Sequence, residues 1–340
     1  MNVLFVGGTG IISTACVELA LKRGMSVSIL NRGNRKEISD TRSLVADVND
    51  LDAARSVLGS VIWDAVVDFT AFSTEDIDRR IELFGGKTRQ YIFISSASAY
   101  QKPIQDYIIT ESTPLVNPFW DYSRNKAACE EKLLDAVRSA RLPATVVRPS
   151  LTFGDTQAPL ALNSWLKPYT AIDRMRKGKS VIVPGDGTSL WTVTHNSDFA
   201  KGLVGLLGNE AAVGHAFHIT SDEVLTWDQI YRYTAQAAGV EEPKLIHIAS
   251  DFIAECIPDI EGSLIGDKSA SAVFDNSKIK RFVPDYVATT RYADGIKSTI
   301  KNFDSDESLR SIDEEANRNY DLLIETYTAG LAAAKKAFSR

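Results

Sequence analysis

Val3-Leu4-Phe5-Val6-Gly7-Gly8-Thr9-Gly10-Ile11-Ile12-Ser13 combines a short apolar run, a glycine-rich turn and the beginning of a helical pattern. Glycines allow the backbone to approach a pyrophosphate closely, and the free N–H groups at a helix start attract its negative charge. Ser13 stands where a GxxGxxG pattern has its third glycine. Because serine is small, we expect binding to survive, and the stretch predicts a dinucleotide-binding turn between a strand and a helix.

Short β-branched runs alternate with helical patterns through the first half of the chain, which is typical of βαβ units and a parallel sheet. We therefore predict an α/β fold with a Rossmann-type, doubly wound parallel sheet over residues 1–150, to which later segments return. Residues 151–303 are expected to form a smaller, partly interleaved substrate-binding region. Residues 304–340 are interpreted as an acidic helical C-terminal extension in contact with solvent, with an oligomer contact as the alternative.

Length and composition are those of an ordinary globular protein of about two domains. The 340 residues carry a net charge of −6, which gives no general attraction to nucleic acid or to an anionic membrane. There is no apolar run long enough to span a membrane, and the first strand pattern begins at Asn2 without a basic and apolar leader, so we expect a cytoplasmic protein. Cys16, Cys129 and Cys256 lie far apart, which favours three buried, reduced thiols over a disulfide or a thiolate metal cluster.

The end of the second predicted strand bears on the choice between NAD and NADP. An acid at this place would bind the ribose hydroxyls, whereas a basic residue would accept a 2′-phosphate. Asn31 carries no charge that repels a phosphate, and Arg32 could pair with one. The sequence leans towards NADP and leaves NAD open. Asp47 and Val48 follow the third strand and are expected to reach the adenine ring, with a loop cap as the alternative for Asp47.

Tyr122 and Lys126 are four positions apart and so lie on one face of a helix. An ammonium group near a phenol favours the phenolate, and we expect it to lower the pKa of Tyr122 towards neutrality and make this residue a general acid and base. The run from Ser95 to Tyr100 supplies hydroxyl groups at the carboxyl edge of the sheet, where ligands of open α/β folds bind.

Taken together, these motifs resemble the extended short-chain dehydrogenases/reductases of the NAD-dependent epimerase/dehydratase family, typified by UDP-glucose 4-epimerase. The resemblance covers roughly residues 1–303. It is carried, in the family's order, by GGTGII at 7–12, ADV at 46–48, SSASAY at 95–100, YSRNK at 122–126, RPSLTFG at 148–154, GDG at 185–187, HNSDFA at 195–200 and DNSKIKRF at 275–282.

The resemblance implies roles for individual residues. Tyr122 would be the catalytic acid and base, Lys126 would hold the nicotinamide ribose while lowering the pKa of Tyr122, and Ser96 would orient the substrate oxygen. The cofactor would be bound by a larger set of residues, namely Gly7, Thr9, Gly10, Ile11, Ile12, Asn31, Arg32, Asp47, Val48, Phe69, Thr70, Lys126 and Pro149. For Phe69, Thr70 and Pro149 the alternative is packing in the core or in a loop.

Departures from the family pattern narrow the chemistry. Family members that dehydrate nucleotide sugars carry an acidic pair where this chain has Ala97-Ser98, so a 4,6-dehydratase reaction is disfavoured. Trp191 stands where members that bind a sugar diphosphate commonly have an arginine, which puts a nucleotide-sugar substrate in doubt. Ser98 and Trp191 are the candidate substrate contacts. His215 and His218 point to opposite faces of a predicted strand, and no metal site is predicted.

The sequence therefore predicts an NAD(P)-dependent enzyme that transfers hydride at a secondary alcohol or ketone of a carbohydrate-like substrate. An epimerase and an NADPH-dependent reductase of a non-nucleotide carbonyl compound both stay open. A non-catalytic, cofactor-sensing binding protein is the alternative from another class. No nucleic acid or membrane partner is expected, and the resemblance implies a possible homodimer.

Overall fold

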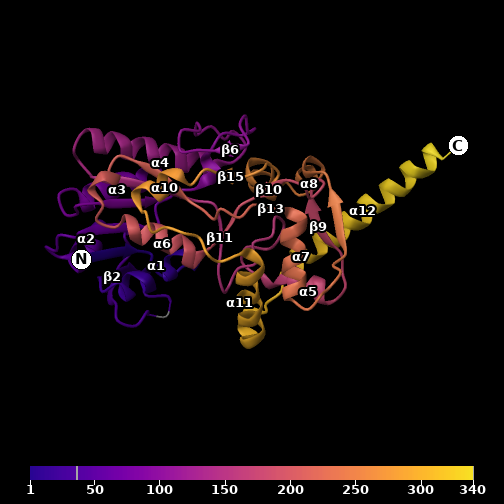
Figure 1. Cartoon of the computed structure of the whole chain (residues 1–340), viewed down its shortest axis with the longest axis horizontal. Helices are drawn as coiled ribbons and strands as arrows, with labels where there is room; N and C mark the ends of the chain where they lie inside the picture. Colours follow the sequence, from indigo (N-terminus) through magenta and orange to yellow (C-terminus); the bar gives the residue numbers. More distant parts are fainter. Residues whose placement is uncertain (36, 340) are drawn as a thin grey trace.

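A parallel sheet of seven strands forms the centre of the computed structural model, which describes every residue except Lys36 and Arg340 (Figure 1). The strand order is β12-β7-β5-β4-β1-β2-β3, and every neighbouring pair is parallel. These strands are β1 (Asn2–Val6), β2 (Ser26–Asn31), β3 (Arg42–Val45), β4 (Ala65–Asp68), β5 (Tyr91–Ile94), β7 (Ala144–Pro149) and β12 (Ala216–Ile219). The predicted doubly wound α/β fold is confirmed.

Both faces of this sheet are buried, as expected for strands joined by helical crossovers. Val3 and Phe5 of β1 pack on the side of α1 (Ile11–Lys22) and α6 (Asn196–Leu206), whereas Leu4 and Val6 belong to the core on the opposite side. That opposite side is covered by α2 (Leu51–Leu58), α3 (Thr74–Phe84) and α4 (Asp121–Arg138). The alternation of side chains along one strand thus serves two separate cores.

The later part of the chain builds a second lobe, which lies beside the carboxyl ends of the sheet strands (Figure 1). Its core contains Trp191, Trp227 and Tyr292 among other aromatic and aliphatic side chains. The strands outside the main sheet are β6 (Ile108–Ile109), β8 (Leu151–Phe153), β9 (Val181–Pro184), β10 (Leu190–Trp191), β11 (Val193–His195), β13 (Leu225–Thr226), β14 (Leu245–Ile248) and β15 (Val273–Phe274). The remaining helices include α5 (Tyr169–Arg176), α7 (Trp227–Ala237), α8 (Ser250–Cys256), α9 (Glu261–Ser263), α10 (Ser277–Phe282) and α11 (Tyr292–Ser305).

The last helix, α12 (Glu314–Phe338), is attached to this lobe by its first half only. Asp321 accepts a hydrogen bond from the buried Arg174 at 2.7 Å, and Leu323 is buried in a small apolar cluster. All described residues from Thr328 onwards are exposed, and the helix extends away from the body of the molecule (Figure 1).

The thiols differ from the prediction. Cys16 and Cys129 are buried, but Cys256 at the end of α8 is exposed, because that end of the helix lies on the surface of the second lobe. Across residues 1–35 and 37–339, no helix is long and apolar enough to cross a membrane.

Candidate functional site

The glycine turn after β1 requires glycine for two different reasons. Gly7 and Gly8 have φ values of +104° and +46°, in the region that disfavours side chains. A Cβ atom on Gly7 would lie 2.9 Å from Cγ2 of Thr70, and one on Gly8 would lie 2.7 Å from Cγ2 of Ile29. The turn therefore leaves its backbone bare at the carboxyl edge of the sheet.

Ser13, which departs from the glycine pattern, has a structural task at the start of α1. Its Oγ accepts a hydrogen bond of 2.7 Å from the N–H of Gly10, the N-cap residue of this helix. The hydroxyl thus satisfies a backbone donor that would otherwise lack a partner at the helix start.

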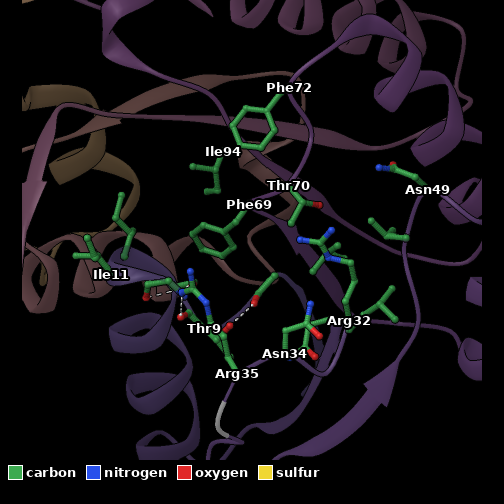
Figure 2. Close-up of a pocket in the computed structure, with 18 of the residues that line it drawn as sticks. Thr9, Ile11, Arg32, Asn34, Arg35, Asn49, Phe69, Thr70, Phe72 and Ile94 are labelled. Atoms are coloured by element: carbon green, nitrogen blue, oxygen red, sulfur yellow. Dashed lines mark hydrogen bonds between the residues drawn. The ribbon is translucent and has the colours of Figure 1, made fainter. Parts of the chain in front are cut away.

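A cavity of about 640 Å³ opens above this turn, at the carboxyl ends of β1, β2 and β4 (Figure 2). All thirteen residues predicted to bind the cofactor line it: Gly7, Thr9, Gly10, Ile11, Ile12, Asn31, Arg32, Asp47, Val48, Phe69, Thr70, Lys126 and Pro149. The structure thus brings these residues together around one cavity, which we name the dinucleotide cavity. Their individual roles stay predictions.

Basic side chains gather at the end of β2, on one side of the dinucleotide cavity (Figure 2). Asn31 uses its side-chain oxygen to accept a hydrogen bond of 2.8 Å from the N–H of Gly33. Arg35 donates to the carbonyl oxygen of Thr9 at 2.7 Å. Arg32 makes no ion pair with any described residue, so its guanidinium is available to an anionic ligand.

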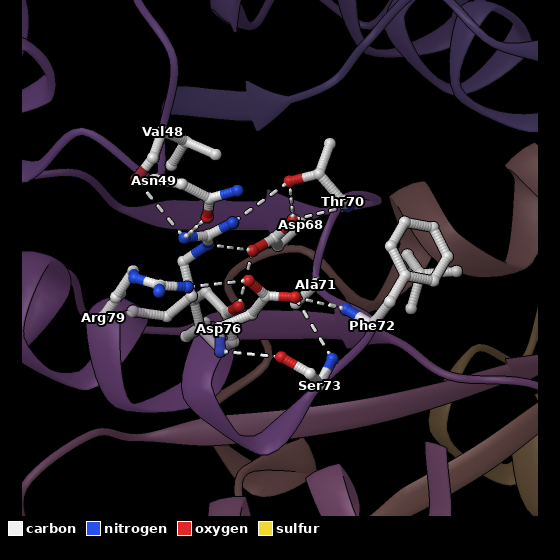
Figure 3. A network of polar contacts seen from close by, with 12 residues as sticks. Val48, Asn49, Asp68, Thr70, Ala71, Phe72, Ser73, Asp76 and Arg79 are labelled. Carbon is white, nitrogen blue, oxygen red and sulfur yellow. Dashed lines mark hydrogen bonds and ion pairs between the residues drawn. The ribbon is translucent and has the colours of Figure 1, made fainter. Parts of the chain in front are cut away.

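A buried polar network supports the floor of this cavity (Figure 3). Asp68 at the end of β4 accepts hydrogen bonds from Arg80 Nε at 2.7 Å, from the Tyr91 hydroxyl at 2.8 Å, and from the N–H and hydroxyl of Thr70 at 2.6 and 2.7 Å. Burial alone would raise the pKa of Asp68, but the charge of Arg80 and the bonds from Thr70 hold it below its usual value.

Arg80 extends this network to the loop that contacts the cavity from the other side. Its Nη1 donates to the carbonyl oxygen of Val48 at 3.3 Å and to the side-chain oxygen of Asn49 at 3.1 Å. Our reading of the sequence missed both Asp68 and Arg80. The signal for Asp68 was present, because a carboxylate that ends an otherwise apolar buried strand requires a partner.

Tyr122 and Lys126 lie in the first two turns of α4 and line the dinucleotide cavity. The ammonium of Lys126 is buried and donates to the carbonyl oxygens of Ala71 and Ile94 at 2.8 and 2.9 Å. It lies 5.8 Å from the centre of the Tyr122 ring. The predicted pair is therefore brought together on one helix face.

The expected lowering of the Tyr122 pKa is wrong. Burial raises the pKa of Tyr122, a side-chain hydrogen bond with Ser96 lowers it, and the charge of Asp267 raises it further. Burial also lowers the pKa of Lys126, to about 8, since desolvation disfavours the ammonium form. The N–H groups of Lys126 point to two carbonyl oxygens and not to the phenol. The pKa of Tyr122 is therefore set mainly by desolvation.

The hydroxyl groups after β5 have distinct partners. Ser95 donates to Glu130, whereas Ser96 Oγ lies 2.9 Å from Ser98 Oγ, which accepts a hydrogen bond of 2.8 Å from Ser123. Ser96 also acts on Tyr122, since it lowers the pKa of that phenol, and its orienting role stays a prediction.

A second cavity of about 620 Å³ adjoins the first, and we name it the substrate-side cavity. The two cavities share Phe72, Tyr122 and Pro149, among other residues. Ser96 and Ser98 line the second cavity, together with Trp120 and residues from the 263–274 segment of the second lobe. Tyr122 therefore lines both cavities and stands where they meet.

The structure does not place Trp191, the other predicted substrate contact, in the site. Its side chain is 1% exposed, packs against Trp227 with ring centres 4.9 Å apart, and lines neither cavity. The indole belongs to the core of the second lobe because β10 turns this side chain inwards.

The described residues hold no group of three or more His, Cys, Asp or Glu side chains that could bind a metal ion.

Comparison with known proteins gives a match to one family model and to several solved structures. Residues 79–220 match the model of the NAD dependent epimerase/dehydratase family. The chain is 27% identical over 261 residues to the chloroplast stem-loop binding protein of 41 kDa b of Arabidopsis thaliana. This alignment covers 72% of the chain and 65% of the relative, which is less than two thirds of that protein.

Two solved structures show the same fold. The dTDP-glucose 4,6-dehydratase of Bacillus anthracis in complex with NAD matches with a TM-score of 0.72 and 18% identity, over 91% of this chain and 98% of that one. The UDP-glucuronic acid 4-epimerase of Bacillus cereus in complex with NAD matches with a TM-score of 0.70 and 16% identity, over 92% and 100% of the two chains.

Proposed function

We propose that this chain is an NAD(P)-dependent oxidoreductase or epimerase of the extended short-chain type, since residues 79–220 match the model of the NAD dependent epimerase/dehydratase family. It transfers hydride at a secondary alcohol or ketone of a sugar or sugar-like substrate, with Tyr122 as acid and base. The observation that carries the proposal is the position of Tyr122 between the dinucleotide cavity and the substrate-side cavity.

The residues of the dinucleotide cavity fit a dinucleotide. A Cβ atom on Gly7 would meet Thr70 at 2.9 Å, so the space above the turn depends on glycine, and α1 begins directly below it. Backbone N–H groups at such a helix start attract a pyrophosphate. The bound nicotinamide would supply the hydride acceptor or donor.

The side chains of this chain would handle the proton. Tyr122 would exchange a proton at the substrate oxygen through its phenolic oxygen, and Ser96 would orient that oxygen through its hydroxyl. Lys126 would hold the nicotinamide ribose from below, where two carbonyl oxygens already fix its ammonium. Residues 1–150 would thus hold the cofactor, and residues 151–303 would complete the substrate-side cavity.

Two versions of this chemistry differ in what happens to the cofactor. An epimerase would keep its cofactor bound, whereas a reductase would exchange it. The free guanidinium of Arg32 would favour NADPH in a reductase. A cytoplasmic location and a homodimer stay predictions.

A binding protein is the second candidate, since one relative is named a stem-loop binding protein. The net charge of −6 gives no general attraction to RNA. The joint presence of Ser96, Tyr122 and Lys126 beside two adjoining cavities favours an enzyme, because a scaffold has no chemical need for an acid and base at this place.

The test begins with the nucleotide released on denaturing the purified protein, identified by mass spectrometry, followed by titration with NAD, NADH, NADP and NADPH. Retained NAD supports an epimerase, and an empty protein that prefers NADPH supports a reductase. Turnover is then measured with UDP-sugars and with simple ketones, for the wild type, for Tyr122→Phe, and for Tyr107→Phe as a control at an exposed tyrosine.

Loss of turnover in Tyr122→Phe alone, with cofactor affinity retained, is the expected result. A protein that binds none of the four nucleotides contradicts the proposal. Equal turnover in Tyr122→Phe and the wild type also contradicts it.

A further inference from the structure

We propose that the substrate-side cavity binds the anionic group of its substrate, a carboxylate or a phosphate, through Lys102 and Lys268. This inference rests on the proposed function and names the substrate class of the same site. It depends on the charge of the cavity wall, on the burial of Lys102, and on polar groups that the protein itself leaves without partners.

The charged residues that line this cavity are Lys102, Asp267 and Lys268. They come from two distant parts of the chain, the loop after β5 and the segment that follows α9. Two ammonium groups face one carboxylate, so the wall carries an excess positive charge. An anionic group on a ligand would neutralise it.

The carboxylate of Asp267 is already engaged. Lys268 donates a hydrogen bond to Asp267 Oδ2, and both side chains are mostly buried. Lys268 Nζ also lies 5.0 Å from the centre of the Trp191 ring, which holds this ammonium over the core of the second lobe. Asp267 therefore already pairs with one of the two lysines, and Lys102 forms no ion pair with a described residue.

Lys102 is the exceptional group. The residue is only 4% exposed, yet no described residue forms a hydrogen bond or an ion pair with its Nζ. Lys126, which is 2% exposed, shows how this protein usually treats a buried ammonium, since two carbonyl oxygens accept its hydrogen bonds. An ammonium that is largely removed from solvent and has no ion pair within the described residues is unfavourable, and a bound anion would supply acceptors for it.

A second polar group supports the same conclusion. Gln157 is 4% exposed and lines the cavity, and its side-chain amide has no hydrogen-bond partner among the described residues. The polar ends of Lys102 and Gln157 thus form no hydrogen bond with a described residue and line the same cavity, where a ligand with polar oxygens would supply partners for both. Trp120 and Phe274 supply apolar walls for the rest of the molecule.

The burial of Lys102 agrees with this assignment. Desolvation lowers the pKa of Lys102, the charge of Asp267 raises it, and the charge of Lys268 lowers it. An anion between the two lysines would remove their mutual repulsion and compensate the desolvation of Lys102.

The experiment is calorimetric titration of the full-length protein, loaded with the nicotinamide nucleotide that it prefers, at constant ionic strength. The probes are inorganic phosphate, gluconate as a carboxylate, and glucose as a neutral control. The variants are Lys102→Met and Lys268→Met, which remove the charge and keep most of the volume, and Lys22→Met as the control at an exposed lysine of α1.

We expect phosphate or gluconate to bind the wild type, and to bind Lys22→Met with the same affinity. Glucose should bind neither protein. Each of the two cavity variants should weaken that binding about tenfold or more, since each removes a charge-assisted hydrogen bond. A preference for phosphate or for gluconate identifies the source of the anionic group. Circular dichroism and the unchanged affinity for the nucleotide confirm that each variant is folded.

The inference is overturned if neither anion binds the nucleotide-loaded wild type, or if both lysine variants bind the anions as tightly as Lys22→Met. Either result leaves the proposed function in place, because nucleotide binding and the role of Tyr122 are measured separately. Should Lys102→Met fail to fold, Lys268→Met and Gln157→Leu decide the question on their own.

Discussion

The Nε atom of Arg80 lies 2.7 Å from Oδ2 of Asp68, and neither side chain has any contact with solvent. The pair joins α3 to the end of β4, and besides the bond from Tyr91 its other hydrogen bonds reach Thr70, Val48 and Asn49. Thr70, Val48 and Asn49 line the dinucleotide cavity. The ion pair thus connects the stability of the sheet to the shape of the cofactor site.

Replacing Arg80 by methionine should destabilise the protein strongly. The substitution leaves the Asp68 carboxylate buried without its charged partner, and breaking one side of such a pair costs about 3–5 kcal/mol. Urea denaturation followed by circular dichroism measures the free energy of unfolding. The double variant Asp68→Asn with Arg80→Met should recover part of the loss, because it removes both charges.

Arg79→Met serves as the control for Arg80. The guanidinium of Arg79 pairs with Asp76 near the surface, where an ion pair contributes about 0–1 kcal/mol. If Arg79→Met and Arg80→Met lower the free energy of unfolding equally, the buried pair does not stabilise the sheet as described.

Lys126 should make the stability depend on pH in a defined window. Burial lowers its pKa to about 8 in the folded chain, whereas an unfolded lysine has a pKa of about 10.4. Between these two values the unfolded chain binds more protons than the folded chain. The contribution of Lys126 to the free energy of unfolding should therefore rise with pH across this window, by up to about 1.4 kcal/mol per pH unit.

The measurement compares urea denaturation of the wild type and of Lys126→Met at pH 7, 8, 9 and 10. Groups away from Lys126 titrate alike in both proteins, so the difference reports mainly on Lys126. A difference that stays constant from pH 8 to pH 10 is incompatible with a lowered pKa for this ammonium.

Arg32→Ala should weaken the binding of NADPH about tenfold or more and leave NADH nearly unaffected, because only NADPH offers a 2′-phosphate for the guanidinium to pair with. Titration of the quenching of tryptophan fluorescence gives both affinities. Arg42→Ala, at an exposed arginine of β3, is the control. Equal losses for NADH and NADPH refute the role of Arg32 in selecting the phosphate.

Trp191→Phe should lower the free energy of unfolding by about 1–3 kcal/mol, because it removes part of a fully buried ring pair. Ligand affinity should not change, since Trp191 does not line either cavity. Trp165→Phe should leave the stability within about 0.5 kcal/mol, because Trp165 is 65% exposed. Weaker substrate binding without a loss of stability in Trp191→Phe would restore its predicted role.

The strands and the dinucleotide cavity could be predicted because their signals are local. Each buried strand is a short apolar run, and the carboxyl ends of parallel strands meet at one edge of a sheet. The residues that follow β1, β2 and β4 therefore converge on one cavity even though they are far apart in the chain. The spacing of Tyr122 and Lys126 needed only the geometry of a helix.

Arg80 and Lys102 could not be predicted from local patterns. An arginine in the middle of a helix usually faces solvent, and only the packing of α3 on β4 places Arg80 beside Asp68. Lys102 lies near Lys268 because a segment more than 150 residues later in the sequence folds over the end of β5. Trp191 stands at the sequence position where family members commonly have a substrate-binding arginine. The direction of its side chain, however, depends on the core of the second lobe.

The single exposed thiol among the three cysteines makes selective labelling possible. Cys256 closes α8, and the same small apolar cluster contains Ile253 of α8 and Leu264 of the segment that continues to Asp267 and Lys268. A maleimide dye should react at Cys256 while Cys16 and Cys129 stay protected. One covalent fluorophore would then report on movement of this segment as a ligand enters, without any engineered cysteine.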